Sequence, residues 1–249
     1  MLVRGAKHLD APNEHLAGRV RPLCPGVSIG HPHGSVGTLG GFVDIDADEG
    51  RQGILSTATV LWPRTAKIGD YIHQPGPIDN PLFTGDTRVA IAEGAALSRR
   101  RRNGMDAAYT LLRESIETTG NMIPDGMPDA GTVIAAPGAA LAEGCRVAKI
   151  GRGTGYTTGR VTACGTSVML HGVEHDRLWQ TAEPEVLDTI EIDGESGAFS
   201  GPGDSGAVVF RLSDFTAVGL LFGSSEIDGR SYAHDIGRVL GVLGLRWRA

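Results

Sequence analysis

Ser200-Gly201-Pro202-Gly203-Asp204-Ser205-Gly206, followed at once by the apolar run Ala207-Val208-Val209-Phe210, is the most informative stretch of this sequence. A serine here precedes a segment of β-strand character,. Glycines without a Cβ let the backbone turn its N–H groups toward one point in space. We therefore expect Ser205 to be a hydroxyl nucleophile, with the N–H groups of Gly203 and Ser205 forming an oxyanion hole beside it.

The composition favours an all-β protein. The 249 residues include 37 glycines, and long helices tolerate glycine poorly. Short strand-like segments separated by turns recur in both halves, without the intervening helices of a doubly wound α/β sheet,. We expect two antiparallel six-stranded β-barrels with a C-terminal helix over residues 235–243, where apolar residues repeat at helical spacing.

The two barrels are expected to form one domain. The segment 114–142 is rich in Gly, Pro, Thr and Asp and reads as the connection between the halves,. We assign residues 1–120 to an N-terminal half and residues 121–249 to a C-terminal half.

Charge and cysteine content exclude several classes of partner. The net charge of −6 makes nucleic acid an unexpected partner,. No apolar stretch is long enough to cross a membrane, and residues 1–21 lack the apolar core of a signal peptide,. Cys24, Cys145 and Cys164 are too few and scattered for a disulfide framework or a metal knuckle,. We therefore expect a cytoplasmic protein without a cofactor. The run of arginines at 99–102 is typical of an exposed loop,.

A serine nucleophile needs a base, and the base needs an acid to orient it. Asp106 is the acid candidate, because it lies in an apolar segment between Met105 and Ala107. An unpaired carboxylate there is costly, so we expect it to have a partner. The alternative is that Asp106 is a turn residue following Asn103-Gly104.

The pattern as a whole resembles the trypsin-like (chymotrypsin-fold) serine peptidases, most closely their bacterial intracellular branch. The segments that carry the resemblance are, in chain order, 37–43, 54–61, 105–108, 147–159, 203–206 and 217–223. They resemble a first-barrel strand, the strand and turn of the catalytic histidine, the aspartate segment, the start of the second barrel, the nucleophile loop and the wall of the specificity pocket. The order base, acid, nucleophile agrees with that family.

The sequence departs from the family at the base. Where the pattern has histidine, this chain has Thr59. A threonine hydroxyl does not accept a proton near neutral pH. Losing the histidine of such a triad lowers kcat about 10⁶-fold. The resemblance therefore implies a peptidase fold that is weakly active or inactive.

Other histidines are the alternatives for the base. His31 and His33 lie in a turn before a first-barrel strand, and His73 lies on a later strand. His171 and His175 belong to an H-x-x-E-H pattern, which on a helix would bind zinc. Gly172 within that pattern favours strand and loop, so we expect no metal,.

The resemblance also implies a substrate pocket. Phe199 corresponds to its base, and Leu221, Phe222 and Gly223 to its wall. An aromatic residue at the base argues against selection of Arg or Lys and favours a small or apolar side chain. The alternative is that Phe199 packs in the core of the second barrel.

Three functions remain open. The first is a trypsin-like serine endopeptidase fold that has lost its base and binds polypeptide, as substrate or protein partner, better than it cuts. The second is an active serine endopeptidase that uses another base. The third is a non-catalytic protein-interaction module.

Overall fold

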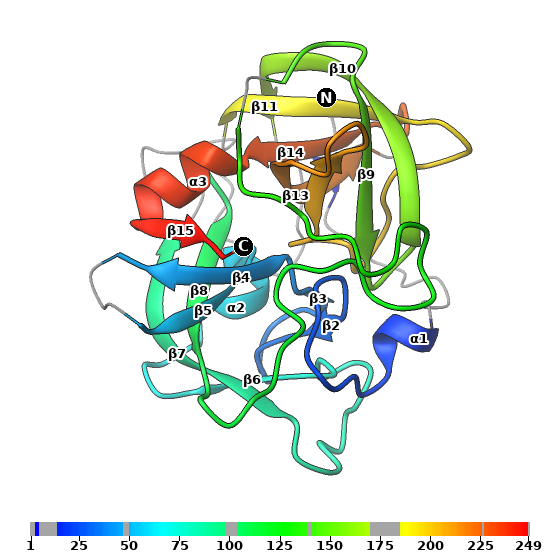
Figure 1. Ribbon diagram of the computed structural model, residues 1–249. Coiled ribbons are helices and arrows are strands. Elements are labelled where there is room, and N and C mark those ends of the chain that lie inside the picture. The colour runs from blue at the N-terminus through cyan, green and yellow to red at the C-terminus, as the bar shows by residue number, and fades with distance from the viewer. Residues whose placement is uncertain are drawn as a thin grey trace.

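The computed structural model describes residues 3–4, 14–46, 50–97, 104–138, 141–169, 185–225 and 227–248. Two β-sheets account for most of this structure, with little helix between them (Figure 1). The arginine run at 99–102 and the H-x-x-E-H pattern at 171–175 lie outside the described residues.

The first sheet consists mainly of N-terminal residues. Its six strands pair antiparallel in the order β15 (Leu245–Trp247), β4 (Gly41–Ile45), β5 (Gln52–Ser56), β8 (Ala107–Leu112), β7 (Arg88–Leu97) and β6 (Tyr71–His73). A separate pair, β2 (Ser28–Ile29) and β3 (Gly37–Thr38), lies beside it.

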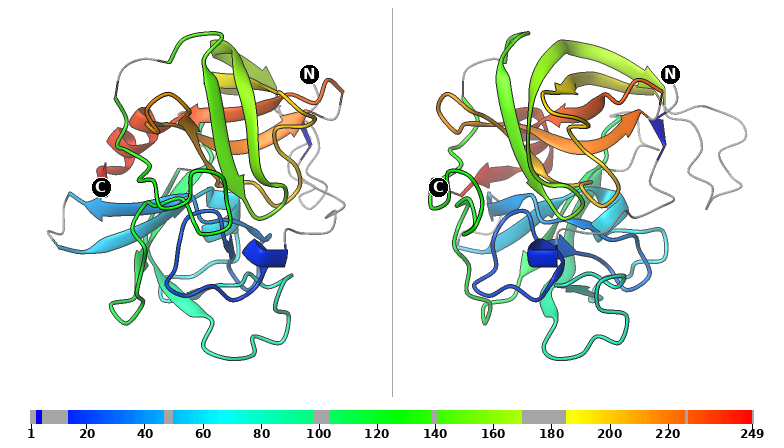
Figure 2. Two further views of the ribbon diagram at one scale, coloured as in Figure 1. Left: turned by 45° about the vertical axis from the view of Figure 1, so that its right-hand side comes forward. Right: turned by 90° about the vertical axis from the view of Figure 1, so that its right-hand side faces the viewer.

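The second sheet closes on itself. Its strands follow the order β1 (Val3–Arg4), β13 (Ala217–Ser225), β12 (Val208–Arg211), β9 (Arg146–Gly151), β10 (Gly155–Met169), β11 (Glu185–Gly194) and β14 (Ser231–Asp235). Because β14 also pairs with β13, the strands from β13 to β14 form a closed barrel. Figure 2 shows this barrel, green to orange, above the blue and cyan strands of the first sheet.

Three short helices complete the fold: α1 (Glu14–Ala17), α2 (Ala58–Leu61) and α3 (Ile236–Leu243). The Asp235 carboxylate caps α3 by accepting a hydrogen bond from Arg238 N at 2.7 Å,. None of the helices in the described ranges is long and apolar enough to cross a membrane. The expected all-β class with a helix near the C-terminus is confirmed.

The sequence pattern suggested that the chain ends with a helix, but a further strand, β15, follows α3. Gly244 follows the helix in the left-handed conformation, with φ of 66°, and this turns the chain into β15. Leu245 and Trp247 are buried there against β4 of the first sheet. β15 thus crosses the expected boundary between residues 1–120 and 121–249, and β1 crosses it in the opposite direction.

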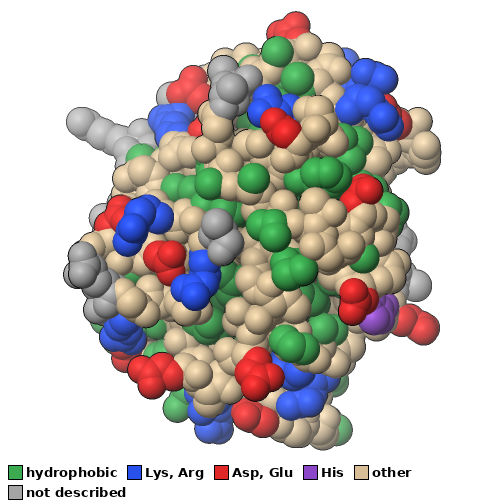
Figure 3. Space-filling model, in the orientation of Figure 1, with side chains coloured by type: hydrophobic (Ala, Val, Ile, Leu, Met, Phe, Trp, Pro, Cys, Tyr) green, Lys and Arg blue, Asp and Glu red, His purple; other side chains and the backbone are tan. Residues whose placement is uncertain are grey.

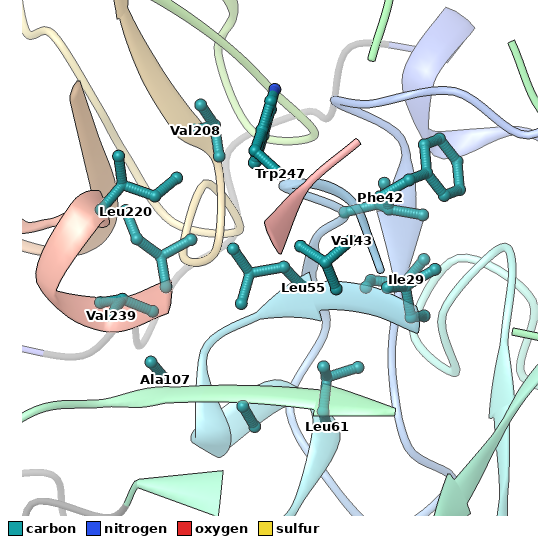
Figure 4. Close-up of a cluster of buried hydrophobic side chains, with 14 of the residues drawn as sticks. Ile29, Phe42, Val43, Leu55, Leu61, Ala107, Val208, Leu220, Val239 and Trp247 are labelled. Carbon is teal, nitrogen blue, oxygen red and sulfur yellow. The ribbon is translucent and has the colours of Figure 1, made fainter. Parts of the chain in front are cut away.

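One hydrophobic core joins the two sheets. Leu55 and Val43 of the first sheet belong to the same buried cluster as Val208 and Leu220 of the second, and Figure 4 shows these side chains together with Trp247. A second cluster fills the closed barrel alone. Because the core is continuous, packing fixes the position of one sheet against the other.

The connection between the halves is pinned by one side chain. The Asn121 side-chain oxygen accepts a hydrogen bond from Phe42 N at 2.7 Å. Its amide nitrogen donates to Phe42 O at 2.9 Å and to Arg248 O at 2.6 Å. Asn121 is 1% exposed, so these bonds replace those it would otherwise make with water.

Candidate active site

Strand pairing brings Thr59 to Asp106. Ser56 at the end of β5 lies opposite Ala108 near the start of β8. The residues just after β5 therefore meet those just before β8. Thr59 N donates to one Asp106 carboxylate oxygen at 3.1 Å, and Thr59 Oγ1 donates to the other at 3.2 Å.

Asp106 is almost completely buried, whereas Thr59 is exposed. Asp106 is 1% exposed, and its own N–H donates to Nε2 of His234 on β14 at 2.9 Å. This bond places the ring proton of a neutral His234 on Nδ1. The His234 ring stacks on Phe222, with 4.2 Å between ring centroids. An exposed residue, Thr59, is therefore hydrogen-bonded to this buried carboxylate.

The Ser205 loop is attached to the first half of the chain by Thr38, which is fully buried. Thr38 N donates to Ser205 O at 2.9 Å. Thr38 Oγ1 donates to Gly203 O at 2.8 Å and accepts from Arg152 N at 2.9 Å. A single residue of the first half therefore holds the Ser205 loop through both its backbone N–H and its hydroxyl.

A buried ion pair holds the loop from the other side. The Asp204 carboxylate lies 3.2 Å from Lys149 Nζ, and both side chains are fully buried. The carboxylate also accepts hydrogen bonds from Gly153 N, Thr154 N, Thr154 Oγ1 and Gly201 N, at 2.7 to 3.1 Å. Burial lowers the pKa of Lys149, and the Asp204 charge opposes that shift.

The loop leaves two backbone donors unused. Gly203 has φ of 92° and Gly206 φ of 95°, a region that favours glycine. A Cβ on Gly206 would lie 1.9 Å from Ser56 Oγ. Within the described ranges, no group accepts a hydrogen bond from Gly203 N or Ser205 N.

Helix α2, which carries Thr59, borders the Ser205 loop at Gly37. A Cβ built on Gly37 would lie 2.3 Å from Val60 Cγ2 and 2.7 Å from Ser205 O. Val60, next to Thr59, and the Ser205 backbone thus both lie close to Gly37. Asp106, Thr59 and Ser205 therefore lie in one region of the interface between the halves.

A second buried ion pair lies beside Gly203. The Arg152 guanidinium forms a bidentate ion pair with Asp79: Nε donates to Oδ2 at 2.9 Å, and Nη2 donates to Oδ1. Ser28 Oγ donates to the same carboxylate at 2.5 Å. Among the described residues, Arg152 Nη1 has no hydrogen-bond partner, and it lies 3.0 Å from where a Gly203 Cβ would be. The sequence did not indicate that Thr38, Asp79 and Arg152 support the Ser205 loop. Of the supporting residues, only Lys149 carried a local signal, because it is a charged residue inside an apolar strand segment.

Two alternative bases are bound elsewhere. His31 Nε2 lies 3.0 Å from Asp70 Oδ2, and His31 Nδ1 accepts from His33 N at 3.1 Å. His73 Nδ1 lies 2.7 Å from Thr87 Oγ1. Burial lowers the pKa of His31. Burial is also the main reason that the pKa of His73 is lowered to about 4. His33 itself is exposed.

The expected pocket residues fall into two groups. Phe199 and Leu221 are buried in the core of the closed barrel, which favours the core-packing alternative for Phe199. Phe222 is buried against His234, and Gly223 is partly exposed opposite Tyr232 of β14. No cluster of three or more His, Cys, Asp or Glu that would hold a metal occurs in the part of the chain that the structure describes.

Comparison with known proteins identifies the fold. No family model and no curated protein sequence matches the chain. Among solved structures, a protease from Nocardiopsis superposes with a TM-score of 0.63 at 17% identity, over 91% of this chain and 98% of that one. Thermobifida fusca protease A gives 0.61 at 15%, over 90% and 98%. A glutamic acid-specific serine protease gives 0.63 at 18%, over 90% and 100%. The chain thus has the chymotrypsin-like double-barrel fold of serine proteases.

We predict that Thr38→Val destabilises the protein by about 1–3 kcal/mol, because Gly203 O and Arg152 N lose their shared partner in a buried site. Thr110→Val is the matched control. The Thr110 hydroxyl is buried and has no hydrogen-bond partner in the part of the chain that the structure describes, so its replacement should leave stability unchanged or raise it. Urea unfolding of the three proteins measures both effects. Equal losses in the two variants would contradict the bonding role of Thr38.

We also predict that Lys149→Met destabilises the protein by about 3–5 kcal/mol, because it leaves the buried Asp204 charge without its counter-ion. The control is Arg146→Met, on the same strand, β9. Arg146 pairs with Glu195, but its side chain is 52% exposed, and exposed pairs contribute little. Thermal unfolding measures the difference; similar shifts for both variants would show that the buried pair is dispensable.

Proposed function

We propose that this protein binds polypeptide at the Ser205 loop of a trypsin-like serine peptidase fold whose base has been replaced by Thr59, so that it is inactive or weakly active. The observation that carries the proposal is the pair of hydrogen bonds from Thr59 to Asp106. Threonine occupies the place in which Asp106 would orient a histidine, and it offers no basic nitrogen there.

The remaining parts of the site have distinct roles in this proposal. Ser205 Oγ is the nucleophile, and the N–H groups of Gly203 and Ser205, which have no hydrogen-bond acceptor among the described residues, stabilise negative charge on a bound carbonyl oxygen. Attack also requires that the hydroxyl proton be accepted, and Thr59 Oγ1 donates its own proton to Asp106. The oxyanion hole and binding alone would leave about 10³–10⁴-fold acceleration over water.

Two observations favour polypeptide as the ligand. The solved structures with the same fold are proteases. The two loop donors point to a carbonyl as their partner, and peptide groups supply one at every residue. Gly223, which is partly exposed, is assigned to the wall of the binding region. The burial of Phe199 in the barrel core removes the support for a preference for small or apolar side chains.

The two alternatives make different demands on the site. An active endopeptidase requires another base. Of the three histidines considered for that role, His31 and His73 are engaged with Asp70 and Thr87, whereas His33 is exposed. A pure interaction module has no need of Ser205. The experiments below separate the three.

Restoring the base should restore activity. We predict that Thr59→His raises kcat on a casein-like substrate by at least about 10³-fold, a part of the roughly 10⁶-fold lost with such a histidine. Thr59→Ala, which removes the hydroxyl without adding a base, should show no gain. Adding Ser205→Ala to Thr59→His should abolish the gain. If Thr59→His gains nothing while remaining folded, the preserved site is refuted and the interaction module is favoured.

The present protein should react slowly with a serine-directed fluorophosphonate. Without a base, Ser205 stays protonated and is a poor nucleophile. We predict labelling at least about 10³-fold slower than in Thr59→His, measured by mass spectrometry over time. Rapid stoichiometric labelling of Ser205 in the unmodified protein would instead establish a working base and favour the active endopeptidase.

A further inference from the structure

The two edges of β13 are not equally covered. On one edge, β14 pairs with β13 from Gly219 to Ser224. On the other edge, β12 pairs only as far as Leu220, and the last contact is from the nucleophile loop, where Gly206 N donates to Leu221 O at 2.8 Å. Beyond Leu221, β13 extends past the end of β12. The backbone N–H and C=O groups on this edge of β13 therefore need another hydrogen-bond partner.

The N-terminal strand β1 provides that partner. Arg4 lies opposite Ser224 and Val3 opposite Ser225, in antiparallel register. Figure 2 shows β1 as a short dark-blue strand beside the closed barrel. Ser225 N donates to Arg230 O on the β14 side at 2.8 Å. Because successive residues of a strand direct their N–H and C=O groups to opposite edges, those of Ser224 face β1.

The direction of β1 relates it to the serine. In antiparallel register, the chain runs from Val3 opposite Ser225 to Arg4 opposite Ser224, that is, toward Leu221 and the loop bonded to it. At about 3.3 Å per residue, Ser224 lies roughly 10 Å along the strand from Leu221. Val3–Arg4 is thus an extended segment on the edge of β13 that, three residues further along, is bonded to the Ser205 loop.

We propose that Val3–Arg4 acts as an intramolecular competitor, occupying the edge of β13 on which an extended polypeptide would pair as it approaches Ser205. Addition of a strand to an exposed sheet edge is a common mode of peptide binding, with affinity supplied by main-chain hydrogen bonds. The occupant here is the chain's own N-terminal segment. The approach of a polypeptide to Ser205 rests on the function proposed above, whereas the occupancy of the edge does not.

Occupancy by a tethered segment weakens the binding of a free peptide in a calculable way. The apparent Kd rises by the inverse of the fraction of molecules with an open edge. A segment that occupies the edge about nine-tenths of the time therefore weakens a competing peptide about tenfold. Because a short tether gives an effective concentration near the millimolar range, the segment competes without being tightly bound.

The test compares three full-length proteins: the unmodified chain, Val3→Pro/Arg4→Pro and Val3→Thr/Arg4→Gln. Proline removes the backbone N–H groups that a strand needs, whereas the second pair of substitutions changes only side chains. The probe is a fluorescein-labelled peptide with the sequence of residues 1–8, followed by fluorescence anisotropy. We expect about tenfold tighter binding to the proline variant than to the other two. Equal affinity for all three would overturn the competition.

Amide hydrogen exchange tests occupancy independently of any ligand or catalysis. In the proline variant, exchange at Ser224 should be at least about tenfold faster than in the unmodified chain, because its N–H loses its partner. The amide of Ser225, bonded to Arg230, should keep its protection and serves as the internal control. Unchanged exchange at Ser224 refutes the occupancy. Faster exchange together with an inactive Thr59→His variant would retain the occupied edge and reject only the proposed function.

Discussion

The arrangement of the whole site depends on the hydrogen bonds of one buried threonine. Thr38 binds Ser205 through its N–H, and Gly203 and Arg152 through its hydroxyl, while its carbonyl accepts a bond from Ser56 Oγ at 2.8 Å. Ser56 ends the strand that leads to Thr59. Because these groups are shielded from water, each needs its partner in place. Thr38 thereby ties the nucleophile loop to the strand that carries the base position.

Buried charge reinforces the same loop. Lys149 pairs with Asp204 within it, and Arg152 beside it pairs with Asp79 of the first half. Charges inside a protein are tolerated only when they are paired and hydrogen-bonded. The Asp204 carboxylate meets this condition through four additional donors, in Gly153, Thr154 and Gly201. None of these contacts involves Thr59, so a substitution at that position removes none of them.

The two proposals concern different needs of one reaction. Thr59 is bonded to the buried Asp106 carboxylate, and the first proposal is that a threonine there limits bond cleavage. Ser224, on the strand bonded to the Ser205 loop, is paired with the chain's own Val3–Arg4, and the second proposal is that this pairing limits access of a polypeptide. Solved proteases share this fold at 15–18% identity, so the double barrel is retained across large differences in sequence.

The sequence by itself determined the all-β class, the helix near the C-terminus and the local motifs around Thr59, Asp106 and Ser205. Those features are encoded by residues close together in the chain, through glycine turns, strand composition and apolar spacing. Only the tertiary structure decided the partners: Asp79 with Arg152, Thr38 with Gly203, β15 with β4 and β1 with β13. Local pattern shows that a residue is buried or extended, but not which distant segment it meets, because that depends on how the two sheets pack around their shared core.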